Sequence, residues 1–387
     1  LNGDWVGVYR RVPLAEQLKD GNDKPQQGLS LLETDNGDIT EFDSVRSFQF
    51  SEDGKWLAIH HMQSKEVEDL NSKNRNLGME LRLKNLSSGE EFELPFVREM
   101  EFDSLSNYLA YSVVDTSDSE NGLYVFDLSE EEVQTIDAVE SGFYTNLTWD
   151  HDQQRIAFTK ATYDSSYVES DASLHIWHAN ANDLTTLVEP GDENTGYTIR
   201  SNNRLMFTND GSRLFFGFMD AAMADLNASD DENGDDGEVD IYDIDDLVDD
   251  RGLDIWHGED PQIKTHEKNT WNSRKNHLYM AVYHLEDEEW VQLADHQMPD
   301  VGLAHNPNIV LGSTDQPYMR ERTWDGTYRD YYTVDLNTGE RTQFLEHFGG
   351  WVNLSPKGKY AAYYEDKHWH LMDMENGDTQ NLTIQVD

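Results

Sequence analysis

Apolar and polar residues alternate in short runs along the whole chain, and polar turns separate these runs. In one recurring segment a polar turn, often with Asp-Gly or Asn, leads into a run of aromatic and small residues. Alternation over about four to eight residues is typical of a half-buried β-strand. Such segments begin at Gly3 ("GDWVGVYR"), Phe50 ("FSEDGKWLAIHH"), Phe102, Leu147, Met206, Trp271, Asn306 and Asn353 ("NLSPKGKYAAYY").

A second recurring segment follows each of the first kind. It has alternating apolar residues, then Asp or Asn, then a turn that often contains Gly, then a polar strand. Asp-Gly and Asn-Gly supply the positive φ that a two-residue hairpin turn requires. These segments begin at Gly28, Met79, Gly122, Ser173, Leu253, Trp290, Tyr331 and His368.

Together the two segments predict a unit of four short antiparallel strands, repeated about every 40 to 60 residues. We therefore predict an all-β fold, a β-propeller of seven or eight four-stranded blades that spans residues 1–387. A β-sandwich or two unrelated β domains is the alternative, and the constant order of the segments favours the propeller. No long segment keeps the 3.6-residue period of a helix.

The blade interpretation makes a specific packing prediction. A single four-stranded sheet cannot bury both of its faces, so each blade must cover its neighbour. Small residues should let the strands approach one another, and larger apolar residues should fill the seams between blades. The small residues are Ala58, Ala110, Ala157 and Ala361, and the seam residues are Leu57, Ile59, Leu109, Tyr111, Ile156 and Phe158.

Two polar stretches interrupt the pattern. Residues 14–27 predict an exposed hairpin loop with one helical turn, and residues 225–250 form an insertion of which about half is acidic. Within the insertion, Asp231, Asn233 and Asp240 have a spacing that imitates an EF-hand calcium loop. The first position of that loop is Ser229 rather than Asp, and no amphipathic helices flank it. A solvated acidic insertion is the alternative.

The charge of the chain restricts its partners. Seventy-seven acidic residues against 29 basic ones give a formal net charge of −48. Binding to nucleic acid or to an anionic membrane requires a basic surface, so neither is expected as a partner. A solvated acidic surface that maintains solubility explains the charge, and a ligand with basic groups is the functional alternative.

The chain has no cysteine, which excludes disulfides, thiolate nucleophiles and cysteine zinc sites. No apolar run approaches the roughly 18 residues that a membrane span requires. The chain begins with Leu1 rather than Met, so we expect it to be a piece of a longer protein whose export signal would lie outside it.

No catalytic motif is apparent in the sequence. Gly-x-Ser-x-Gly, a phosphate-binding loop and a dinucleotide fingerprint are all missing. Adjacent His60 and His61 should point to opposite faces of a strand, whereas His368 and His370 share a face. Two histidines without a third ligand are weak support for a metal, so we predict structural roles for them and assign no catalytic residue or required cofactor.

Several blade segments resemble the N-terminal propeller of prolyl oligopeptidase-type serine peptidases, the S9 family. The resemblance is carried by "SEDGKWLAIHH", by the run from Ser355 to Thr383, and by "LDIWHGEDPQIK", which is similar to a "DIWHWKDP" segment of bacterial family members. Gly258 and Glu259 replace the commoner Trp-Lys pair. The resemblance covers essentially the whole chain, although TolB-like propellers use similar turn sequences.

The resemblance implies a propeller that restricts substrate access to an α/β-hydrolase domain carrying Ser, Asp and His. That domain is not present in this sequence, and no position here matches a triad residue. We therefore expect a substrate-gating domain, with a C-terminal hydrolase domain and peptides as partners, in the periplasm or outside the cell. The alternatives are a TolB-like protein-binding propeller and a propeller enzyme with calcium in its channel.

Overall fold

A computed structural model describes residues 3–13, 26–63, 76–152, 154–192, 194, 196–225, 257, 259–303 and 308–385. The chain folds into two compact units. The first comprises Leu1–Asp192 and Arg200–Leu205, and the second comprises Glu193–Ile199 and Met206–Asp387. Each unit is a series of antiparallel sheets, and the two are described separately below.

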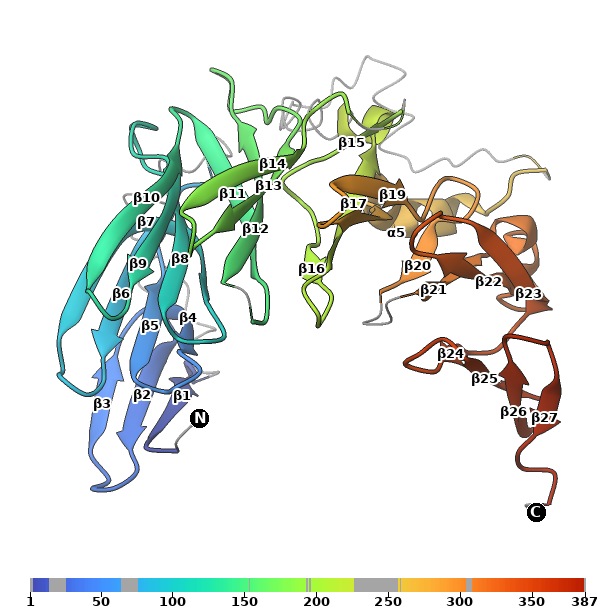
Figure 1. The fold of residues 1–387 in the computed structure, drawn as a ribbon, viewed down its shortest axis with the longest axis horizontal. Helices are drawn as coiled ribbons and strands as arrows, with labels where there is room; N and C mark the ends of the chain where they lie inside the picture. Colours follow the sequence, from blue (N-terminus) through green and yellow to red (C-terminus); the bar gives the residue numbers. More distant parts are fainter. Residues whose placement is uncertain are drawn as a thin grey trace, which may run out of the picture. The chain divides into compact units, whose positions relative to one another are not determined.

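The first unit contains three sheets (Figure 1). A three-stranded sheet has the order β1-β2-β3, a seven-stranded sheet runs from β4 to β10, and a four-stranded sheet has the order β11-β12-β13-β14. The bounds are β1 Trp5–Arg10, β2 Gly28–Glu33, β3 Ile39–Phe42, β4 Val45–Phe50, β5 Trp56–His61, β6 Met79–Asn85, β7 Glu91–Phe102, β8 Tyr108–Val113, β9 Gly122–Asp127, β10 Glu132–Ala138, β11 Gly142–Trp149, β12 Arg155–Thr162, β13 Ser173–His178 and β14 Asp183–Val188.

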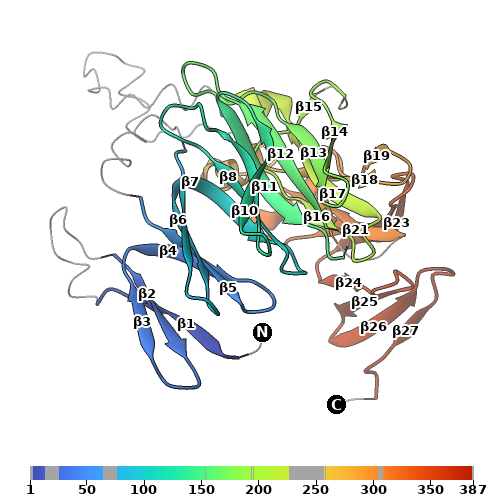
Figure 2. The same ribbon diagram turned by 60° about the vertical axis from the view of Figure 1, so that its left-hand side comes forward.

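The second unit also contains three sheets (Figure 2). In the first, β15 and β16 both pair with β17, and β18 and β19 follow; the other two sheets each have four strands in sequence order. The bounds are β15 Tyr197–Thr198, β16 Met206–Phe207, β17 Arg213–Asp220, β18 Tyr279–His284, β19 Glu289–Gln292, β20 Asp300–Gly302, β21 Ile309–Thr314, β22 Arg329–Asp335, β23 Arg341–Phe348, β24 Val352–Leu354, β25 Tyr360–Glu365, β26 His368–Asp373 and β27 Thr379–Asn381.

Strand β7 divides the seven-stranded sheet into two blades. Its first half pairs with β6 (Leu81 with Leu94), and its second half pairs with β8 (Phe102 with Leu109). Pro95 lies between the halves, where the register shifts and no ladder donor is required. Gly78 is required beside this point, because a Cβ there would lie 1.8 Å from the carbonyl oxygen of Phe96.

With β7 shared in this way, the described residues form seven blades in chain order. Blade 1 is β1–β3, blade 2 is β4 to the first half of β7, and blade 3 is the second half of β7 to β10. Blade 4 is β11–β14, blade 5 is β15–β19, blade 6 is β20–β23 and blade 7 is β24–β27. The predicted fold class, an all-β propeller, is therefore confirmed, with a blade count at the lower of the two values predicted. Five blades have four strands, blade 1 has three described strands, and in blade 5 both β15 and β16 pair with β17.

The eighth predicted repeat does not exist as a separate blade. The segments beginning at Met206 and Trp271 both belong to blade 5, because β17 pairs directly with β18 from Arg213↔His284 to Phe218↔Tyr279. The acidic insertion and a helix separate these two strands in the sequence. The two turn segments therefore belong to the two strands of one hairpin, which the prediction had assigned to separate blades.

A turn of constant geometry joins the first and second strands of five blades. The turn starts with Ser, Asp or Thr, whose backbone N–H donates to the carbonyl of the residue five positions later. The backbone N–H of that later residue donates in turn to the side-chain oxygen of the Ser, Asp or Thr. For Ser51 these bonds join it to Trp56 over 3.0 Å each, and for Asp103 they join it to Tyr108 over 3.1 and 2.7 Å. Asp150, Thr208 and Ser355 start the equivalent turns. This shared bonding explains why the segments resemble one another.

The turns between the third and fourth strands are longer than predicted. In blade 2, Asn85 pairs with Glu90, so four residues form the loop, and the N–H of Gly89 donates to the carbonyl of Asn85 over 2.8 Å. The φ of Gly89 is +79°. The same bond joins Gly339 to Asp335 and Gly377 to Asp373. Glycine supplies the positive φ as expected, but the two-residue hairpin prediction was wrong, because a side-chain oxygen of Asn or Asp bonds the loop N–H groups and favours the wider turn.

The predicted seam residues are buried. Leu57 and Ile59 of blade 2 pack against Leu29 and Leu31 of blade 1, and Leu109 and Tyr111 of blade 3 pack against Ala58 of blade 2. Ile156 and Phe158 of blade 4 pack against Ala110 of blade 3 in the same way. Ala58, Ala110, Ala157 and Ala361 are all 0% exposed. Blades within each unit therefore cover one another, as the size of a single sheet requires.

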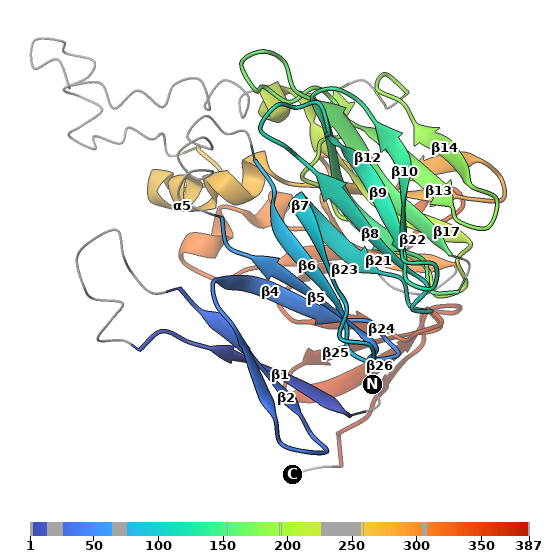
Figure 3. The ribbon, with the colours of Figure 1, turned by 90° about the vertical axis from the view of Figure 1, so that its left-hand side faces the viewer.

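Helix α5 (Lys264–Lys275) was not predicted (Figure 3). None of its residues is buried, so it carries no apolar stripe from which a 3.6-residue period could be recognised. Two short 3-10 helices, η2 (Gln316–Tyr318) and η3 (Glu321–Thr323), precede β22. In the part of the chain that the structure describes, no helix has the length and apolarity needed to cross a bilayer.

Candidate functional site: an arginine-lined pocket

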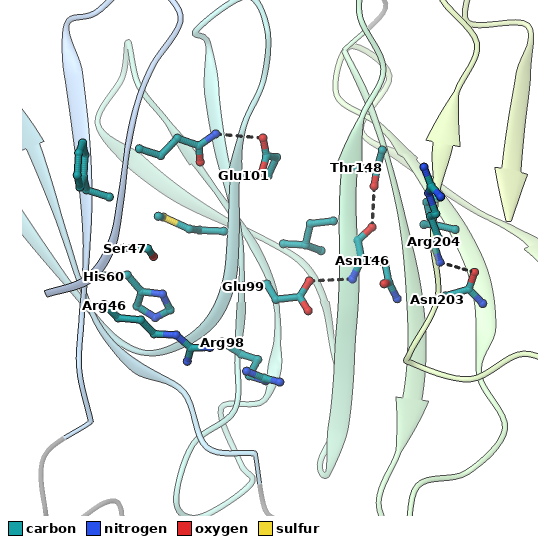
Figure 4. Close-up of a pocket in the computed structure, with 15 residues that line it drawn as sticks. Arg46, Ser47, His60, Arg98, Glu99, Glu101, Asn146, Thr148, Asn203 and Arg204 are labelled. Atoms are coloured by element: carbon teal, nitrogen blue, oxygen red, sulfur yellow. Dashed lines mark hydrogen bonds between the residues drawn. The ribbon is translucent and has the colours of Figure 1, made fainter. Parts of the chain in front are cut away.

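The first unit contains an open pocket of about 590 Å³ on the first strands of blades 2, 3 and 4. Strands β4, β7 and β11 contribute most of its lining, and residues 203–205 complete it. Figure 4 shows that polar side chains dominate the labelled part of this lining. The charged and ionisable members are Arg46, His60, Arg98, Glu99, Glu101 and Arg204.

Arg46 and Arg98 hold equivalent positions in consecutive blades. The register shifts between Val45 and Ser47 on β4, and between Val97 and Glu99 on β7, so each arginine lies in a β-bulge. Ser47 then pairs with His60, and Glu99 pairs with Ser112 at the same place in the next blade. Bulges of this kind redirect a side chain, and they are frequent beside binding sites.

Each bulge follows a residue in the left-handed region. The φ of Ser44 is +53°, and that of Phe96 is also +53°. A non-glycine residue with positive φ costs free energy unless its surroundings compensate. The repetition of this conformation two residues before each arginine shows that the redirected side chains are a constant feature of blades 2 and 3.

His60 of β5 lies near the two arginines and connects β5 to β7. It is buried, and its Nε2–H donates to the carbonyl of Val97 over 2.8 Å. Burial lowers the pKa of His60 below its ordinary value, and the positive charges of Arg46 and Arg98 lower the pKa further, against the opposing effect of the Val97 hydrogen bond. His60 is therefore a neutral structural contact at neutral pH, and the arginines supply the positive charge.

Glu99 connects β7 to β11 across the pocket. Its Oε2 accepts the backbone N–H of Asn146 over 2.7 Å (Figure 4). Burial raises the pKa of Glu99, while Arg98 and the backbone N–H groups of Asn146 and Leu147 oppose that rise. Asn146 has a φ of +60° and lies in the bulge of β11, so this carboxylate fixes the strand conformation that shapes the pocket wall.

Glu101 also connects neighbouring blades, through its carboxylate and its backbone carbonyl. Its Oε1 accepts the side-chain amide of Gln49 over 3.1 Å, and its backbone carbonyl accepts the indole N–H of Trp149 over 3.0 Å. Burial raises the pKa of Glu101 as well. Both carboxylates thus bind protein groups of neighbouring blades.

The arginines of the pocket differ from most others in the molecule. Arg82, Arg155, Arg322 and Arg329 each form an ion pair with a carboxylate. Within the described ranges, Arg46, Arg98 and Arg204 have no carboxylate oxygen within 4.0 Å of a guanidinium nitrogen. The Nε of Arg98 is buried without a hydrogen-bond partner among these residues, and the guanidinium Nη1 of Arg46 lies 3.6 Å from the sulfur of Met79.

A second pocket of about 390 Å³ adjoins the first. Arg46 and Arg98 line both, so they stand at the boundary between the two. The rest of the second lining consists of amide and apolar side chains, namely Gln26, Met62, Gln63, Asn76, Leu77 and Met79. Such a surface can bind polar groups through hydrogen bonds and apolar groups through contact.

The metal-binding prediction falls outside the described structure. Asp231, Asn233 and Asp240 lie in residues 226–256, which the structure does not describe. Among the residues that it does describe, no group of three or more His, Asp or Glu side chains is placed to hold a metal ion. His370 instead stacks on Tyr363, with ring centroids 5.3 Å apart.

The sequence analysis missed the arginine pocket, although a signal was present. "VRSFQF" (45–50) and "VREMEF" (97–102) both place Val-Arg at the same distance before the Phe that opens the turn segment. The predicted repeat segments begin at Phe50 and Phe102 and therefore do not include the arginines.

The fold defines the class of the protein: it is a β-propeller domain with blades of antiparallel strands in chain order. No protein-family model matches the chain, and no curated protein sequence matches it. Structural comparison finds similarity to propeller-containing proteins of several functions.

One similar structure is the β-propeller domain of the Trilobed protease from Pyrococcus furiosus, with 12% identity, a TM-score of 0.40, and coverage of 100% of this chain and 96% of that one. A prolyl endopeptidase matches with 9% identity and a TM-score of 0.40, over 93% of this chain and 46% of that chain. Oligogalacturonate lyase from Vibrio parahaemolyticus matches with 10% identity and a TM-score of 0.37, over 91% of this chain and 83% of that one. Peptidase domains and lyases thus share this type of fold, and the function must be argued from the residues.

Proposed function

We propose that the chain is the substrate-gating propeller of an S9-type serine peptidase, and that an α/β-hydrolase domain of the same polypeptide hydrolyses oligopeptides. The observation that carries the proposal is the blade turn that begins at Ser51 and recurs at Ser355, together with the segment from Leu253 to Lys264 that resembles family members. In this proposal the propeller admits short peptides and the pocket of the first unit contributes to their selection.

The proposal is tested with the complete protein. We expect its reading frame to continue past Asp387 into Gly-x-Ser-x-Gly, followed by Asp and His, and the protein to react with a serine-directed fluorophosphonate. It should cleave short peptides and leave a folded protein intact, whereas the 387-residue chain alone should show neither activity.

A reading frame without these motifs would refute the proposal, and so would full-length protein that neither reacts with the probe nor cleaves peptides. Those results would favour a propeller that binds protein partners.

A further inference from the structure

The arginine pocket conflicts with the charge of the whole chain. The protein has 77 acidic and 29 basic residues, yet three arginines of the first unit line one pocket without a carboxylate partner among the described residues. In a chain so rich in Asp and Glu, ion pairing of each arginine would need only one nearby substitution. Their unpaired state therefore calls for an explanation other than surface charge.

Arg98 is costly to the fold as it stands. Its side chain is partly buried, and its Nε has no hydrogen-bond partner in the described structure. A buried donor without a partner destabilises a protein, since water would otherwise satisfy it. Residues that cost stability and are not explained by packing are frequent at binding sites. Arg98 also lines the pocket, so its guanidinium can contact a ligand that brings its own acceptors.

The positions of the two arginines define where that ligand would lie. Both belong to equivalent bulges of adjacent blades, both act on the pKa of His60, and both line the two neighbouring pockets. In Figure 4 they lie at the same end of the first pocket, below His60, while Arg204 lies across it beside Asn203. An extended ligand could therefore place an anionic group at the boundary and its remaining length along the amide and apolar lining.

We propose that Arg46 and Arg98 bind the carboxylate of a peptide ligand, and that the amide side chains of Gln63 and Asn76 line the path of the peptide. Guanidinium groups bind carboxylates through paired N–H donors of matching planar geometry. The carboxylate chemistry follows from the pocket itself. The choice of a peptide as its carrier rests on the proposed function.

A carboxylate fits this pocket better than a phosphate does. Glu99 and Glu101 line the same cavity, and the chain carries a net charge of −48. Repulsion from these groups grows with the charge of the ligand, so a monoanion is favoured over a dianion. Two forked donors also match the two oxygens of one carboxylate.

The test uses the 387-residue chain and isothermal titration calorimetry. N-acetyl-trialanine with a free carboxylate is the probe, and its C-terminal amide is the matched ligand. Three further ligands are an amidated peptide with an internal Glu, succinate, and inorganic phosphate. We expect the free acid to bind at least tenfold more tightly than its amide and more tightly than phosphate.

Variants locate the binding. Arg46→Gln and Arg98→Gln should each weaken binding of the free acid about tenfold or more, as expected for the loss of a charged hydrogen bond. Arg82→Gln is the matched control, because Arg82 lies on the same sheet and also has a buried Nε without a hydrogen-bond partner in the described structure, but pairs with Glu80 and lines neither pocket. It should change the affinity less than twofold.

A stability measurement separates a binding role from a structural one. Arg98→Met keeps the length of the side chain and removes the unsatisfied donor, so it should raise the unfolding midpoint while abolishing discrimination between acid and amide. A structural arginine would instead lower the midpoint when replaced.

The outcomes are distinct. Measurable binding of acid and amide with equal affinity, no binding of any carboxylate ligand, tighter binding of phosphate, or full affinity in both Gln variants would overturn the proposal. Binding of the internal-Glu peptide alone would support the carboxylate site and assign it to a side chain. Binding of succinate without any peptide would overturn the peptide assignment and leave the carboxylate site, while the proposed function would still be decided by the reading frame and by the fluorophosphonate reaction of the full-length protein.

Discussion

Blades 2 and 3 have the same backbone and different chemistry. Strand β4 pairs with β5 in the same register in which β7 pairs with β8, and each first strand carries an arginine in a bulge. In both blades a side-chain oxygen at the start of the turn accepts the backbone N–H five residues later. Yet Ser47 and Gln49 of blade 2 correspond to Glu99 and Glu101 of blade 3. The residues that maintain the blade and the two pocket arginines are repeated, whereas the next pocket-lining positions on the same strands differ.

The largest expected effect concerns the repeated core. Leu57 and Leu109 occupy equivalent seams and are both 0% exposed. Leu57→Ala and Leu109→Ala should each lower the free energy of unfolding by about 2 to 5 kcal/mol, because each leaves a cavity. Urea unfolding of the chain measures this. The control Val133→Ala, at a half-exposed position, should cost about 0.5 kcal/mol or less, and a loss below about 1 kcal/mol in either leucine variant would contradict the equivalence.

Substitutions in the turns should lower the free energy of unfolding by less than the core substitutions do, and by different amounts in blades 2 and 3. Asp103→Ala removes the acceptor of two backbone N–H groups, whereas Ser51→Ala removes the acceptor of one. We expect losses of about 2 to 3 kcal/mol and about 1 kcal/mol respectively, from donors left without a partner. Asp103→Asn is the control, because it retains an oxygen acceptor and removes a charge whose burial raises the pKa of Asp103. A variant Asp103→Asn as unstable as Asp103→Ala would indicate that the charge, and not the hydrogen bonds, stabilises the turn.

The smallest expected effect is a pH dependence from Glu99, whose counterpart in blade 2 is Ser47 and carries no carboxylate. The pKa of Glu99 is raised in the fold, so its protonation favours folding. This contribution is fully present below the unfolded pKa and is lost as pH rises through the folded pKa, so Glu99 by itself should add stability as the pH falls from 7. His60 acts oppositely, because its lowered pKa means that protonation opposes folding below about pH 6.5.

Comparison with Glu99→Gln isolates the carboxylate. The variant should be more stable than wild type at pH 7, and the difference should shrink as pH falls toward 5. Thermal unfolding in 0.5 M salt measures it, since salt screens the general repulsion. The exposed Glu93→Gln serves as control. A constant difference across this pH range would show that Glu99 keeps an ordinary pKa.

The sequence was sufficient to predict the blades, because their turns and seams depend on local rules. Ser51 and Asp103 bond a backbone group only five residues away, and Leu57 and Ile59 belong to one alternating strand. The blade count was harder, since the 58 residues between Asp220 and Tyr279 conceal the direct pairing of β17 with β18.

The pocket could not be predicted in the same way. Arg46 and Arg98 are 52 residues apart, and their common location depends on the packing of two blades and on bulges that no residue type specifies. Asn146 and Arg204 come from still more distant parts of the chain. The repeated Val-Arg pair was visible, but only the register of the strands shows that it faces a cavity.

Strand β7 has a consequence for how the first unit opens. In that sheet one 12-residue strand serves as the last strand of blade 2 and the first strand of blade 3, with no loop between them. Two blades joined by a loop could unfold one at a time, whereas blades 2 and 3 share the continuous strand β7. Amide hydrogen exchange should therefore report β5 and β8 as members of one cooperative unit. The strands that carry the two pocket arginines would then unfold together rather than one at a time.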